Sequence, residues 1–210
     1  MYVKINQNGF ISNLRKNEKI FFEKINTFNT FHMPRWKDLP EIDLYMDQVI
    51  SVTDKYLSVM AVSDDPVLTP SMINNYVKNR ILPPPVKKKY SREHLAKLLV
   101  ICILKPVMEI SAIADIMERS EKLFGIEKML DDFLEMFEAR LSTLSRDISA
   151  AFEKEEKTEE MLCAITIENA VRSGTEKIIA NFAYSAFGKK KDAEKDKEKD
   201  KADKKKEEKE

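Results

Sequence analysis

Apolar residues recur at helical spacing through most of the chain, and they predict a series of helices separated by prolines and polar turns. A short helix is predicted near residues 17–25. A longer one should run from Pro40 to about Val62, with an apolar face formed by Ile42, Tyr45, Met46, Val49, Val52 and Tyr56. Thr69-Pro70 predicts a sharp helix start, because a hydroxyl caps free N–H groups and proline suits the first helical position. This helix should end near Asn79.

The second half of the chain shows the same periodicity. Beyond the helix-breaking run Pro83-Pro84-Pro85, Ser91 should cap a helix that continues to Leu104 and ends before Pro106. A short helix is predicted from Ser111 to Met117, and one or two helices should fill residues 158–187. Between them, a long helix from about Ser120 to Lys157 is predicted from apolar residues spaced by about 3.6 positions, namely Leu123, Ile126, Leu130, Phe133, Phe137, Leu141, Leu144, Ile148 and Phe152.

Composition supports a mainly α fold. Only four glycines occur, whereas sheet-rich folds and phosphate-binding loops need residues that adopt positive φ. We divide the chain into a partly ordered segment (1–33), a first folded domain (34–118), a helical region (119–188) and a tail (189–210). The tail contains 11 lysines and 9 acidic residues among 22 residues, so it is predicted to be disordered or a lone solvated helix.

A formal net charge of zero conceals strong segregation of charge along the chain. Residues 38–65 carry 1 basic and 7 acidic side chains, residues 69–105 carry 8 and 1, and residues 106–160 carry 7 and 15. A solvated helix face usually mixes both signs, so this basic segment favours an anionic partner such as DNA. The alternative is that the basic segment pairs with its acidic flanks inside the fold.

The basic segment also has the element order of a helix-turn-helix protein, in which one helix contacts base edges in the major groove. In the helix from Pro70 to Asn79, Met72, Ile73, Tyr76 and Val77 form an apolar face and leave polar side chains opposite. Asparagine can pair with adenine, and lysines on a loop can contact phosphate, although a solvated helix face could look the same. The predicted DNA-contacting residues are Ser71, Asn74, Asn75, Lys78, Arg80, Lys87, Lys88, Lys89, Tyr90 and Arg92.

This stretch resembles the MerR-type winged-helix module. The matching residues are Ile73, Tyr76, Ile81-Leu82-Pro83-Pro84, Lys87-Lys88-Lys89, Tyr90-Ser91, Leu95 and the run Ile110-Ser111-Ala112-Ile113-Ala114-Asp115-Ile116. The resemblance implies a winged helix-turn-helix-like domain over residues 34–118 that binds double-stranded DNA. Asn74 and Asn75 stand where that family has an arginine and the first tyrosine of a pair, and Arg80 stands at its helix-exit glycine.

Residues 34–36, 39–49, 71–78 and 89–96 are also similar to an uncharacterised bacterial family, the domain of unknown function numbered 1836. That resemblance implies family membership and no particular activity.

No catalytic or metal-binding constellation is visible, so we expect neither an enzyme nor a cofactor. His32 and His94 are far apart and lack further ligands at suitable spacing; His94 is expected to cap or pack, and the carboxylates of Asp131, Asp132, Glu135 and Glu138 to line a solvated helix face. Cys102 and Cys163 have apolar neighbours and should be buried in a reducing compartment. Because no secretory signal or membrane span is visible, a cytoplasmic location is expected.

Two hypotheses about function remain open. The first is a DNA-binding transcriptional regulator that uses the winged helix-turn-helix, binds double-stranded DNA as a homodimer through residues 120–187, and responds to an unknown effector. The second is a non-catalytic interaction scaffold whose degenerate winged helix binds acidic protein surfaces.

Overall fold

The computed structural model describes residues 16–61, 66–152 and 158–188, which are mainly helical, as predicted. No β-strand forms among these residues, where only the isolated β-bridges Leu44–Tyr90 and Val86–Lys89 occur, so the winged part of the predicted fold is not confirmed. The chain divides into two units, residues 1–168 and 169–210, which are described separately. The predicted disordered tail, 189–210, lies outside the described residues, as does the first part of the N-terminal segment.

The N-terminal helices agree with the predicted elements except at one helix start. Helix α2 (Lys16–Thr27) covers the predicted 17–25, and a short 3-10 helix, η1 (Trp36–Asp38), follows. Helix α3 (Met46–Leu57), extended by η2 (Ser58–Met60), begins six residues after Pro40, where a helix start was predicted.

The reason for this late start is that Leu44 pairs with Tyr90. The N–H of each residue donates to the carbonyl of the other, at 2.9 and 2.8 Å, and holds the backbone before α3 out of the helix. The predicted apolar face is therefore wrong at its beginning, where Ile42 and Tyr45 are 73% and 52% exposed.

Helix α4 (Pro70–Lys78) begins and ends as its sequence predicts. The Thr69 hydroxyl accepts a hydrogen bond from the Met72 N–H at 3.2 Å, and Pro70 occupies the first turn. Ile73 and Tyr76 are buried, so the predicted apolar face is confirmed. Helix α5 (Arg92–Leu104) follows the cap residue Ser91, and nine of its thirteen residues are buried, as expected for a helix that is apolar on all sides.

Two predicted boundaries in the second half are wrong. Helix α6 runs over Ile110–Phe124 with Glu109 at its N-cap, whereas a helix from Ser111 to Met117 was predicted. Helix α7 (Ile126–Phe152) then begins after Gly125, so no continuous helix starts at Ser120. Gly125 has φ +80° and ψ 156°, a combination that is almost restricted to glycine and interrupts the helix. Leu123, predicted for the apolar stripe, is consequently 74% exposed.

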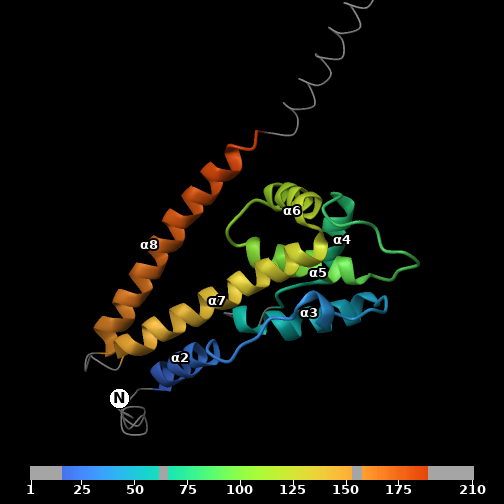
Figure 1. The fold of residues 1–210 in the computed structure, drawn as a ribbon. Helices are drawn as coiled ribbons and strands as arrows, with labels where there is room; N and C mark the ends of the chain where they lie inside the picture. Colours follow the sequence, from blue (N-terminus) through green and yellow to red (C-terminus); the bar gives the residue numbers. More distant parts are fainter. Residues whose placement is uncertain (1–15, 62–65, 153–157, 189–210) are drawn as a thin grey trace, which may run out of the picture. The chain divides into compact units, whose positions relative to one another are not determined.

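Helix α7 contributes residues to two hydrophobic cores, and in Figure 1 it runs past both α2 and the helices α5 and α6. Its N-terminal half places Leu130 and Leu134 in the main core with α3, α4, α5 and α6, so this core continues past residue 118. Near its C-terminal end, Phe152 packs with Phe22 of α2 and Met161 of α8 (Thr158–Ser185) in a second, smaller core. The Ser145 hydroxyl also donates to the Ile25 carbonyl at 2.8 Å, which ties α7 to α2.

The two cysteines differ in burial. Cys102 is buried in the main core, as predicted, and burial raises the pKa of its thiol to about 12. Cys163 on α8 is exposed, so the prediction that both thiols are buried is wrong for this residue. The neighbours of Cys163 in sequence are apolar, but this part of α8 also exposes large apolar side chains such as Ile167.

Candidate nucleic-acid interface

The polar face of α4 lies on the surface, opposite the buried Ile73 and Tyr76. Its exposed members are the predicted contact residues Ser71, Asn74, Asn75 and Lys78, joined by Asn79 and Arg80 at the end of the helix. Asn79 is held to its own helix, because its side-chain amide donates to the Asn75 carbonyl and side-chain oxygens at 2.9 Å. The remaining donors of this face are available to a partner.

Arg80 ends α4 in a left-handed backbone conformation. Its φ is +59°, its N–H donates to the Val77 carbonyl at 3.0 Å, and the Ile81 N–H donates to the Tyr76 carbonyl at 2.9 Å. This hydrogen-bond pattern is a Schellman motif, in which glycine usually occupies the left-handed position. An arginine here costs about 1–2 kcal/mol of backbone strain relative to glycine.

The connection between α4 and α5 projects from the helices and carries a tight basic turn (Figure 1). Val86 and Lys89 form an antiparallel bridge with reciprocal N–H to carbonyl bonds of 3.0 and 2.9 Å, which leaves Lys87 and Lys88 as the two central residues. Their φ values of +49° and +64° fit a type I′ turn, where Asn and Gly are the favoured residues. We call these four residues, 86–89, the basic turn.

The basic turn therefore holds two exposed lysines in a conformation that lysine disfavours. Each left-handed lysine costs about 1–2 kcal/mol. Backbone strain of this kind clusters at functional sites, where the side chain rather than the backbone preference is needed.

Three other predicted contact residues are engaged within the fold. Lys89 places its ammonium 5.1 Å from the centre of the Tyr45 ring. Tyr90 is buried in the main core, where its ring meets His94 edge to face. Arg92 lies 3.1 Å from a Glu41 carboxylate oxygen and stacks at 5.2 Å over Trp36. Their side chains hold the structure together rather than facing outward.

His94 joins the two ends of the α4–α5 connection. Its Nδ1 accepts a hydrogen bond from the Ser91 N–H at 3.0 Å, and its Nε2 lies 3.1 Å from the Pro83 carbonyl oxygen. With Nε2 protonated and Nδ1 free, the neutral ring satisfies both contacts. Burial lowers the pKa of His94, and the Pro83 carbonyl opposes this effect without cancelling it. The prediction that His94 caps or packs is confirmed.

The basic segment is only partly neutralised from within. Arg92 pairs with Glu41, and Lys97 pairs with Glu121 at 2.9 Å, so the expected internal pairing is real for these two cations. Within residues 16–61, 66–152 and 158–188, no acidic partner is found for Lys78, Arg80, Lys87 or Lys88. We call these four residues the free cations.

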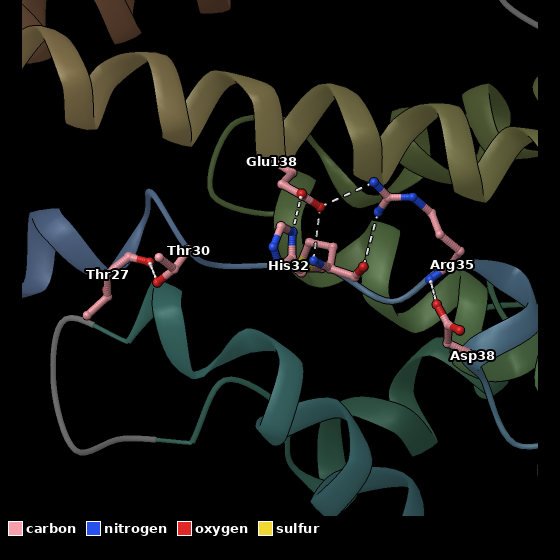
Figure 2. Close-up of polar contacts among 7 residues, drawn as sticks. Thr27, Thr30, His32, Arg35, Asp38 and Glu138 are labelled. Atoms are coloured by element: carbon pink, nitrogen blue, oxygen red, sulfur yellow. Dashed lines mark hydrogen bonds and ion pairs between the residues drawn. The ribbon is translucent and has the colours of Figure 1, made fainter.

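A second polar cluster, which the sequence analysis missed, lies on α7. Glu138 accepts hydrogen bonds from the Met33 N–H at 3.1 Å and from Arg35 Nη2 at 3.2 Å, and its other oxygen is 2.8 Å from His32 Nδ1 (Figure 2). Two helical turns earlier, Asp131 accepts the Trp36 N–H at 2.6 Å. We call Asp131 and Glu138 the acidic clamp, because they hold residues 33–36 against α7.

The acidic clamp corrects the expectation that these carboxylates are simply solvated. Burial alone would raise the pKa of Glu138, but hydrogen bonds from His32 and Met33 and the charge of Arg35 outweigh it, and the pKa is lowered. The sequence does contain a signal for this cluster. Asp131 and Glu138 are seven positions apart, so they share a face of the helix, and each directly follows an apolar position, Leu130 or Phe137.

No metal or membrane feature emerges from the part of the chain that the structure describes. There, no group of three or more His, Cys, Asp or Glu side chains is arranged to hold a metal ion. None of the described helices is both long enough and apolar enough to cross a bilayer.

The described residues thus define a mainly helical protein that presents a polar helix face and a strained basic turn ahead of a buried helix. Residues 34–137 match the model of the family described as Domain of unknown function (DUF1836), which supports the family resemblance seen in the sequence. The match extends from the segment held by the acidic clamp, through α4, the basic turn and α5, into α7. Comparisons with curated proteins and with solved structures find no match.

Proposed function

We propose that this protein is a DNA-binding regulator that contacts double-stranded DNA through the polar face of α4 and the basic turn. The observation that carries the proposal is the set of free cations, Lys78, Arg80, Lys87 and Lys88, on a basic segment in which Arg92 and Lys97 pair with acidic residues. Cations that contact phosphate release counterions from DNA, which gives affinity that depends strongly on salt.

Two features of the geometry support DNA over a smaller anion. The polar face of α4 exposes Asn74, whose amide can pair with the edge of an adenine, beside Asn75, whose side-chain oxygen already accepts a hydrogen bond from Asn79. The basic turn follows in the chain and projects outward, so it could reach a phosphate backbone beside the groove that α4 enters (Figure 1). This arrangement is consistent with the MerR-type resemblance of the sequence, in which a helix and a basic wing act together.

Symmetric DNA sites normally require a protein dimer, and we include a homodimer in the proposal. In the second unit, helix α8 exposes Val171, Ile178 and Phe182, which share one stripe at helical spacing. An apolar stripe of this kind favours a protein partner, and a second copy is the simplest one. The same stripe would serve the second candidate function, an interaction scaffold without DNA binding.

The experiment that tests the proposal is a titration of a fluorescently labelled mixed-sequence duplex with the full chain, followed by anisotropy from about 50 to 200 mM salt. We expect Lys87→Ala/Lys88→Ala to weaken binding about tenfold or more at the lowest salt and to reduce the salt slope by about 2, one unit for each lost phosphate contact.

The matched control is Lys122→Ala/Lys128→Ala. These lysines are also exposed and the net charge changes equally, but both pair with acidic residues four positions away on their own helices. Its affinity and salt slope should remain close to those of the wild type. Absence of DNA binding by the wild type at low salt, or equal losses in both double variants, would contradict the proposal and favour the scaffold.

A further inference from the structure

A cavity of about 240 Å³ lies where helices α5, α6 and α7 meet in the first unit. Val100 of α5, Met117 of α6, and Met129 and Phe133 of α7 contribute to its wall, and at least Val100, Met117 and Met129 are themselves buried. All three helices contribute residues to the main core, so the wall is part of that core.

The rim of this cavity is also apolar. Phe124 and Met136 line it and are 57% and 59% exposed. Phe124 is the last residue of α6, and the glycine-specific backbone of Gly125 immediately after it separates α6 from α7. The helix break therefore leaves large apolar groups beside an opening to solvent.

The polar atoms of the cavity limit the charge of a ligand. Only Ser120 and Asp132 among the lining residues are polar, and Asp132 already pairs with Lys128 at 2.7 Å. A charged ligand would lose its hydration on entering the cavity and would find no unpaired charge of opposite sign there to compensate. Three methionines, Met117, Met129 and Met136, line the cavity, and methionine side chains adapt readily to the shape of an apolar ligand.

The volume limits the size of a ligand. An apolar cavity of about 150 Å³ binds benzene in an engineered protein, so about 240 Å³ suits two fused rings or an aliphatic body of similar bulk. The cavity is too small to receive a helix from another protein. Together, size, apolar lining and the absence of an unpaired charge among the described lining residues favour a small molecule.

We propose that this cavity binds a small, uncharged, hydrophobic molecule of about the size of a bicyclic aromatic ring. The proposal goes beyond DNA binding and does not depend on it. We call the cavity the methionine pocket.

The test is a titration of the full chain, labelled with ¹³C at its methionine methyl groups, with 1-naphthalenemethanol. The methyl signals of Met117, Met129 and Met136 should shift in a saturable way. Met33, Met46 and Met161 do not line the pocket and provide internal controls, so their signals should stay in place. The charged analogues 1-naphthoate and 1-naphthylmethylammonium carry the same ring and should bind about tenfold more weakly or worse.

A filled pocket supplies a second measurement. Ser120→Phe places a ring within the cavity and should abolish the saturable shifts, whereas Leu123→Phe, at a 74% exposed position on the same helix that does not line the pocket, should preserve them. If Ser120→Phe does not fold, the wild-type titration with its methionine controls still tests whether the pocket binds the ligand.

Three outcomes would overturn the proposal. The first is that the three pocket methyl signals do not move up to the solubility limit of the alcohol. The second is that all methionine signals move together, or that the charged analogues bind equally well, because either result indicates nonspecific adsorption. The third is that the pocket signals respond to protein dilution instead of to ligand, which would show that a second copy covers the pocket.

Discussion

The free cations and the acidic clamp are both groups of charged residues, yet they differ in what they contact. Glu138 and Asp131 reach across to backbone N–H groups of residues 33–36 and are largely occupied within the fold. Lys87 and Lys88 extend from a strained turn without an acidic partner among the described residues. The acidic clamp holds distant segments of the chain together, whereas the left-handed lysines of the basic turn add backbone strain to the folded state.

This difference shows that the number of charged residues in a segment does not reveal what those residues contact. Residues 106–160 carry the most acidic side chains, and two of these have structural contacts more than 90 positions away in sequence. Residues 69–105 carry the basic block, and its four free cations have no such contacts among the described residues. Stability measurements can separate the two groups, because loss of the clamp should lower the free energy of unfolding, whereas relief of the left-handed backbone at Arg80, Lys87 and Lys88 should raise it.

The largest effect is expected for Glu138→Ala. The substitution removes the acceptor for the Met33 N–H and for Arg35, and it should lower the free energy of unfolding by about 2–3 kcal/mol. The contact with His32 should add little, since that side chain is 80% exposed. Urea denaturation followed by circular dichroism measures the change.

Glu135→Ala is the matched control for the clamp, because Glu135 is exposed on the same helix. It should change the free energy of unfolding by no more than about 0.5 kcal/mol. Equal losses in the two variants would show that Glu138 acts through helix propensity or general charge instead of through its specific contacts.

The second prediction concerns the basic turn. Lys87→Asn/Lys88→Gly installs the residues that a type I′ turn favours and should raise the free energy of unfolding by about 1–2 kcal/mol. The same change removes two free cations, so DNA affinity should fall while stability rises. Thermal or urea unfolding and the anisotropy titration give the two measurements on one protein sample.

Lys78→Asn is the control for this pair of effects, since Lys78 lies in the regular helix α4 and carries no left-handed strain. It should lose DNA affinity without any gain in stability. If the turn variant is less stable than the wild type, the left-handed lysines are not strained and the comparison with the acidic clamp fails.

A smaller effect is expected for Arg80→Gly. The substitution relieves the left-handed backbone at the end of α4 but adds freedom to the unfolded chain, so a net gain of about 0.5–1 kcal/mol is expected. Arg80→Ala removes the same charge without relieving the strain and should not stabilise. Comparing the unfolding midpoints of the two variants in urea separates charge from backbone conformation.

Local signals along the chain predicted much of this fold. The Thr69 cap, the buried face of α4 and the buried helix α5 all follow from patterns within a few residues, and the structure confirms them. Boundaries that depend on distant contacts were wrong. The start of α3 is set by pairing of Leu44 with Tyr90, which no local pattern around Pro40 contains.

The candidate site was predictable to a similar extent. The exposed positions on α4 and the lysines of the turn follow from periodicity and charge, whereas Tyr90 and Arg92 are engaged by residues far earlier in the chain, Leu44 and Glu41. The acidic clamp was missed because its backbone partners lie about 100 residues earlier. Sequence patterning shows which residues are charged, but long-range contacts decide which of those charges remain free.

The smallest predicted effect is a difference in pH dependence between His94, in the α4–α5 connection, and the acidic clamp. Burial lowers the pKa of His94, which holds the ends of the α4–α5 connection, below its ordinary value of 6.5. The unfolded chain therefore takes up this proton first as the pH falls. The stabilising contribution of neutral His94 is fully present above pH 6.5 and is lost as the pH drops through the folded pKa.

The acidic clamp should respond in a lower pH range. Because the folded pKa of Glu138 is lowered from 4.5, its contribution is present above that pH and disappears as the pH falls through the folded value. His94→Gln keeps a side chain that can accept the Ser91 N–H but does not titrate. Relative to the wild type, it should flatten the stability profile just below pH 6.5 and leave the decline below pH 4.5 unchanged. Urea midpoints measured from pH 7.5 to 3.5 test this, and an unaltered profile in the upper range would show that protonation of His94 does not loosen the connection.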